Sequence, residues 1–92
     1  MAHCPYEKVQ HLRHEFDLIS SWDGIKEKKP GIFYYRSKGF LHFHIKEKRI
    51  WADIRSGDSW GPEINISEKM TSSQRAAFLK IVEEHYKKTS SK

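Results

Sequence analysis

The chain of 92 residues has a single cysteine and no long apolar run. Cys4 has no partner for a disulfide within the chain and no second thiol to resolve a redox intermediate, so we expect a reducing compartment and an incidental role. No apolar stretch approaches the roughly 20 residues that span a bilayer, and the first residues lack the apolar segment of a secretion signal. These absences predict a cytoplasmic protein with no membrane partner.

Charge is unevenly placed along the chain. Lys and Arg number 17 against 12 Asp and Glu, a net charge of +5, and the whole excess falls within residues 22–55. A basic surface there attracts phosphate-bearing partners, although lysines also keep sheet edges and turns soluble. The aromatic content of 13% supplies enough apolar bulk to favour a folded domain over a disordered segment.

Two segments have the periodicity of amphipathic helices, and they lie on either side of a strand-rich centre. The first is expected over residues 5–20 and the second over about 72–88. The second begins at a capping box, in which Thr71 accepts a hydrogen bond from the amide of Gln74 and the Gln74 side chain reaches back. The apolar stripe of the first helix consists of Val9, Leu12, Phe16 and Ile19.

The centre of the chain reads as an antiparallel sheet. Aromatic and β-branched residues favour strands there, with turn-forming residues between them. The charged residues 25–30 are expected to form a link, and residues 56–63, which are rich in turn formers, a loop. The expected strands are residues 32–36, 40–45, 50–55 and, as a short fourth strand, 64–66.

The second and third strands form a hairpin whose pairing follows from its turn. If residues 47–48 are a two-residue turn, His42 faces Asp53 and His44 faces Trp51. Side chains alternate between the two faces of a strand, so both histidines lie on one face. The apolar residues of the two strands share the opposite face: Leu41, Phe43, Ile45, Ala52 and Ile54.

The turn before this hairpin leaves one choice open. Gly39 is expected to supply a positive φ in the turn of residues 37–39. A three-residue loop with a bulge places Tyr34 opposite His42, and a two-residue loop places Tyr35 there. Either way, a tyrosine is expected beside His42.

These elements predict an α+β domain of two layers, with the element order α-β-β-β-(β)-α. An antiparallel sheet of three to four strands is covered on one face by the N-terminal and C-terminal helices, which pack on its apolar side. The whole chain, residues 1–92, is expected to be a single domain in which residues 1–4 and 89–92 fray.

The face that carries the histidines is the candidate binding surface. His42, His44 and Asp53 can hold a divalent metal ion, the one cofactor that the sequence suggests, or can form a cross-strand hydrogen bond without any ligand. A His–Asp pair also suits acid–base catalysis, but no nucleophile, oxyanion hole or deep pocket accompanies it, so no catalytic residue is assigned. The candidate surface comprises Phe40, His42, His44, Trp51, Asp53 and Arg55.

Aromatic and basic residues on this face are typical of two further kinds of partner. Open sheets stack the bases of single-stranded nucleic acid, but only the opening of the RNP1 pattern is present, at Lys38–Phe40. An exposed patch with Phe40, His44 and Trp51 also suits a protein partner or self-association. Trp60, in the expected loop, is the residue that would otherwise cover the patch within the monomer.

Part of the chain resembles a group of small uncharacterised bacterial proteins. The shared features are a Pro-Gly-x-Phe-Tyr strand, a Phe-Leu-His-Phe-His strand and an Ala-Asp-Val/Ile strand, found here within residues 29–55. The resemblance implies a small domain of helices and strands in a bacterial cytosol, and it implies no activity. The basic turn at residues 47–49 departs from the longer acidic turn of the group, so no shared ligand is implied at that end of the hairpin.

The sequence therefore predicts a small cytoplasmic binding or interaction domain that works through its His/Asp/Trp/Arg face and is not an enzyme. The alternative is a metal-dependent or His–Asp acid–base enzyme that uses the same residues. A third possibility is single-stranded nucleic-acid binding on the basic, aromatic sheet.

Overall fold

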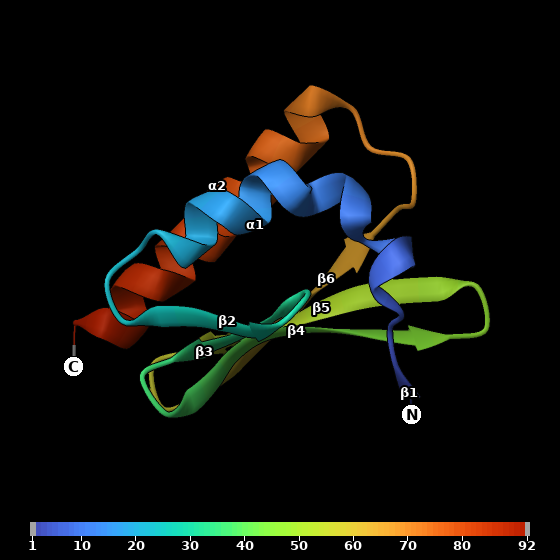
Figure 1. The fold of residues 1–92 in the computed structure, drawn as a ribbon. Coiled ribbons are helices and arrows are strands. Elements are labelled where there is room, and N and C mark those ends of the chain that lie inside the picture. Colours follow the sequence, from blue (N-terminus) through green and yellow to red (C-terminus); the bar gives the residue numbers. More distant parts are fainter. Residues whose placement is uncertain (1, 92) are drawn as a thin grey trace.

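The computed structural model describes residues 2–91 and has two helices on one side of an antiparallel sheet (Figure 1). This is the predicted α+β fold, with one helix before the main strands and one after them. The helices and strands are β1 (Ala2–His3), α1 (Arg13–Ser20), β2 (Ile25–Lys29), β3 (Ile32–Tyr35), β4 (Lys38–Lys46), β5 (Arg49–Ser56), β6 (Ser59–Ile66) and α2 (Ser72–Ser90).

The five longer strands form a meander in the order β2-β3-β4-β5-β6. The short strand β1 pairs with β4, so that Ala2 lies opposite Ile45 and His3 lies opposite His44. Every pairing is antiparallel. The order places β4 and β5 in the middle of the sheet, where residues on either face have neighbouring strands on both sides.

The hairpin of β4 and β5 has the predicted register. His42 pairs with Asp53 and His44 pairs with Trp51. Residues 47–48 make the turn, and Glu47 takes a positive φ of 57°. A tight turn and the alternation of side chains are both local properties, so the sequence was sufficient to define this part of the sheet.

The sheet has more strands than the three to four predicted. Residues 25–29, expected to be a link, form β2, and residues 59–66 form β6 where a loop and a short strand were expected. Charged side chains suit β2 because it is an edge strand. The turn between β5 and β6 is only two residues long, and Gly57 in that turn takes a φ of 71°.

A partly buried ion pair joins β2 to α1. The guanidinium of Arg13 donates to a carboxylate oxygen of Glu27, whose side chain is only 16% exposed. The other carboxylate oxygen accepts from the amide of Gly31, at 2.8 Å, in the turn between β2 and β3. This arrangement raises the pKa of Arg13, mainly through its hydrogen bond to Glu27.

The N-terminal helix is shorter than predicted. Residues 5–12 are wound as two 3-10 turns, and α1 begins only at Arg13. The break occurs at Val9, whose φ of −126° is far from helical. The predicted stripe is nevertheless confirmed, because its members are at most 1% exposed: Val9, Leu12, Phe16 and Ile19.

Residues within the two ends that were predicted to fray make hydrogen bonds to the rest of the fold. The backbone amide of Cys4 donates to the carbonyl of Phe43, and the buried hydroxyl of Thr89 accepts from the amide of Gly57. Residues 1 and 92, which belong to the same prediction, lie outside the described residues. The capping box at the start of α2 is confirmed by both of its hydrogen bonds, between Thr71 and Gln74.

The core lies between the sheet and the helices, on the face predicted from the alternation of β4. We call this face the inner face. The Phe43 ring lies 5.5 Å from that of Phe16 in α1 and 6.2 Å from that of Phe78 in α2. Ala52 and Ile54 of β5 are fully buried against the same cluster.

Phe40, expected on the histidine face, is a core residue. Phe33 pairs with Leu41 and Tyr34 pairs with Gly39, so Phe40 is an extra residue in β4, a β-bulge. The bulge breaks the alternation, and Phe40 and Leu41 are both fully buried. The Phe40 ring packs against a tyrosine of α2, with 6.3 Å between the centroids.

The turn before β4 also differs from the prediction. It consists of Arg36 and Ser37, and the positive φ of 57° belongs to Arg36 rather than to Gly39. Because of the bulge that follows, neither expected tyrosine is the register partner of His42. Tyr34 does line the same hollow as His42, so a tyrosine is present beside it.

Candidate functional site

The face of the sheet away from the helices, here called the outer face, has a cluster of polar side chains at its centre. His42 and His44 come from β4 and Asp53 comes from β5. Alternation along each strand turns these side chains away from the neighbouring core residues Phe43 and Ala52. The cluster therefore stands on the two most central strands of the sheet.

The three side chains converge closely enough to share a ligand. One possible ligand atom from each of His42, His44 and Asp53 lies within 4.8 Å of the others. His44 Nε2 and Asp53 Oδ2 are 2.8 Å apart, and the two imidazole rings meet edge to face at 4.5 Å. The side chains of His44 and Asp53 are 12% and 26% exposed, so water is largely but not fully excluded.

Trp51, predicted to be an exposed part of the binding surface, is only 5% exposed. The guanidinium of Arg49 lies 4.5 Å from the centroid of its ring, and the ring of His44 lies 5.4 Å away. Arg49 is held there by Glu63 at 2.8 Å and by Asn65 at 3.2 Å, both on β6. Trp51 is therefore covered by Arg49 and packs against His44 of the cluster, so it offers little surface to a partner.

Trp60 provides the exposed aromatic surface in its place, with 47% of the residue accessible. It extends from β6, and its ring lies 4.9 Å from that of His42. Arg55 supports it from β5 with its guanidinium 5.0 Å from the ring centroid, and Arg55 Nε also donates to the Gly39 carbonyl at 2.6 Å. Trp60 was not predicted to lie in a strand, because Gly61 and Pro62 favoured a loop over residues 56–63. An alternation of side chains continued through residues 59–66 would have placed it in β6.

A shallow hollow of about 220 Å³ lies beside the cluster of His42, His44 and Asp53. Gly39 lies beneath Trp60: a side chain at that position would begin 3.5 Å from the indole ring. His42 belongs both to this hollow and to the cluster, so the two are continuous. The residues that line it are Ile32, Phe33, Tyr34, Gly39, His42 and Trp60.

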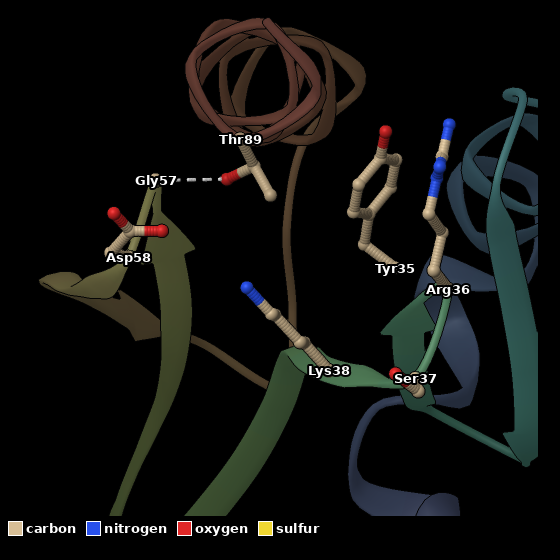
Figure 2. A pocket seen from close by; sticks show the side chains of 7 residues that line it. All are labelled: Tyr35, Arg36, Ser37, Lys38, Gly57, Asp58 and Thr89. Atoms are coloured by element: carbon tan, nitrogen blue, oxygen red, sulfur yellow. Dashed lines mark hydrogen bonds between the residues drawn. The ribbon is translucent and has the colours of Figure 1, made fainter. Parts of the chain in front are cut away.

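A second hollow, of about 210 Å³, lies at the end of the sheet where two turns meet α2 (Figure 2). Lys38 points into the space between Asp58 and Tyr35. Thr89 closes one side, where its hydroxyl accepts from the Gly57 amide at 3.0 Å. Charges of both signs line this hollow, and none of the sequence-predicted site residues contributes to it.

Burial raises the pKa of the Cys4 thiol, an effect that Lys8 partly opposes, so the reactive thiolate is disfavoured. Burial also lowers the pKa of His85 and raises that of Tyr86, both on α2. The shift at Cys4 agrees with the incidental role that the sequence suggested for it.

Comparison with protein-family models, with curated proteins and with solved structures finds no match to this chain. Among the helices of the described residues, none is long and apolar enough to cross a membrane. The functional interpretation therefore depends on the chemistry of the outer face.

Proposed function

We propose that the protein is a small binding domain and that its outer face binds a divalent transition-metal ion through His42, His44 and Asp53. The observation behind this proposal is the convergence of one ligand atom from each residue to within 4.8 Å. Imidazole nitrogen and carboxylate oxygen together suit Zn²⁺ and other divalent first-row metals. Three protein ligands would leave at least one coordination position for water or for an exogenous ligand.

The distances in the cluster support the proposal. Ligand atoms that lie about 2.0–2.2 Å from one ion are roughly 3.0–3.5 Å from each other in tetrahedral or octahedral geometry. The His44–Asp53 pair, at 2.8 Å, is already close to that spacing. Within a cluster whose longest separation is 4.8 Å, side-chain rotations alone would complete the set.

The position of the cluster supports the proposal as well. All three ligands stand on strands rather than loops, so their Cα positions are fixed by the hydrogen bonds of the sheet. His44 is packed against the buried Trp51, which restricts its ring. Among the described residues, no serine, threonine, cysteine or lysine side chain lines the hollow beside the cluster, so we favour binding over catalysis.

Titration of metal-free protein with ZnCl₂ by calorimetry is the direct test. We expect one ion per chain, with protons released at a pH where the histidines are partly charged, because a metal binds only neutral imidazole. His44→Ala and Asp53→Ala each remove a ligand, so they should weaken binding by more than the 10–100-fold that the loss of an outer-shell partner causes.

His14→Ala is the matched control, because His14 is an exposed histidine of α1 on the other side of the molecule. It should leave the affinity for Zn²⁺ unchanged. A wild-type protein that takes up no Zn²⁺, or an Asp53→Ala variant that binds it as tightly as wild type, would exclude this site.

A further inference from the structure

Resting on the proposed metal site, we infer that the hollow between Tyr34 and Trp60 receives the planar aromatic group of a small ligand that also coordinates the metal. The hollow and the metal cluster share His42, so a ligand bound at an open metal position has the hollow directly beside it. The inference names the class of molecule that would occupy the outer face: an aromatic compound with an anionic, metal-binding head group.

The walls of the hollow suit a flat ring. Tyr34 and Trp60 supply aromatic surfaces, and Ile32 supplies aliphatic carbon. Its volume of about 220 Å³ exceeds the roughly 150 Å³ at which an apolar cavity accepts benzene. A single aromatic ring therefore fits in the hollow.

Trp60 is placed to make the main contact. Its ring already touches His42 and Arg55 and lies over Gly39, and yet the residue remains 47% exposed. An exposed tryptophan that is held on several sides loses little conformational freedom when a ligand covers it. Gly39 contributes by having no side chain, because an added one would compete for the space beneath the indole.

Charge around the hollow favours an anionic head group. Arg55 lies against Trp60, and the ammonium of Lys28 lies 4.5 Å from the centroid of the Tyr34 ring. A bound divalent cation would add to this positive potential. A neutral or anionic aromatic chelator is thus favoured over a cationic one.

Two hydroxamates separate the contribution of the ring from that of the metal. Acetohydroxamate and benzohydroxamate chelate a metal through the same two oxygens and differ in the phenyl group. We expect benzohydroxamate to bind the Co²⁺-loaded protein at least tenfold more tightly, as followed by the visible spectrum of the ion. Trp60→Ala should reduce this preference to about twofold or less, because it removes the main wall of the hollow.

Leu18→Ala is the control, since Leu18 is the other large exposed apolar residue of the described chain and lies on α1. It should keep the tenfold preference. If Co²⁺ binds but the two hydroxamates have equal affinity, or if Trp60→Ala keeps the preference, the inference is wrong while the metal site stands. If neither Co²⁺ nor Zn²⁺ binds, the proposed function itself fails, and the inference fails with it.

Discussion

The two faces of strand β4 lie in different environments. Phe43 points inward and is 3% exposed between two helices, while His42 and His44, on either side of it, point outward among polar groups. The inner face is closed by packing and the outer face is open to solvent at Trp60. One strand thus separates the residues that stabilise the fold from those available for binding.

This separation has a physical basis in the period of the strand. Because successive residues of a strand point to opposite faces, a substitution at an outer position such as His42 or His44 leaves the packing of the inner face intact. The separation has one exception, because the bulge places Phe40 on the inner face rather than on the outer one. Predictions about stability and about binding can therefore be tested separately on adjacent residues of β4.

The largest effect is expected for Phe43→Ala. Removal of a buried phenyl ring between α1 and α2 leaves a cavity, and such changes cost about 3–5 kcal/mol of unfolding free energy. Urea denaturation followed by circular dichroism measures this loss. A Phe43→Ala protein as stable as wild type would mean that the inner and outer faces are assigned the wrong way round.

His42→Ala should cost less than about 1.5 kcal/mol in the same denaturation experiment. The residue is half-buried on the outer face, so its loss removes at most a net hydrogen bond and part of a ring contact with Trp60. The same variant should lose affinity for Zn²⁺. A His42→Ala protein that fails to fold would show that the outer face, like the inner face, is needed for stability.

The smallest effect concerns a histidine on the helix side. Burial, and secondarily Lys88, lower the pKa of His85 below its usual value near 6.5, against an opposing effect of Glu84. The unfolded state therefore takes up a proton first as the pH falls, so the stability present above pH 6.5 declines below it.

Replacement of His85 by Gln removes this titration, and the variant should lose less stability than wild type between pH 7 and pH 5. Melting temperatures across that range, measured for both proteins, give the comparison. Parallel curves would show that the environment of His85 does not disfavour its charged form. The two proteins differ only at residue 85, so all other contributions cancel in the difference.

The features that the sequence could predict are those fixed by local rules. The register of His42 with Asp53 follows from a two-residue turn, the stripe from Val9 to Ile19 follows from helical spacing, and the cap at Thr71 follows from a four-residue motif. Each depends on residues close in sequence. The convergence of His42, His44 and Asp53 follows from the same register.

The features that the sequence did not predict depend on distant strands. The burial of Trp51 requires Arg49 to be held by Glu63, and Glu63 lies in β6, a strand expected to be a loop. The bulge at Phe40 has no residue signature of its own, because any residue can be the extra one. β2 was missed because charged residues resemble a linker unless the strand is known to be an edge.

The position of α2 in the chain has a consequence for biosynthesis. The meander of β2 to β6 is built from consecutive hairpins, which form within microseconds once their residues are available. Part of the cover of the inner face is α2, whose 19 residues the ribosome adds over about one to four seconds. During that interval Phe43, Ala52 and Ile54 lack their α2 neighbours, so apolar surface of the nascent chain is exposed. Chaperones can bind this surface, and other copies of the chain can aggregate through it.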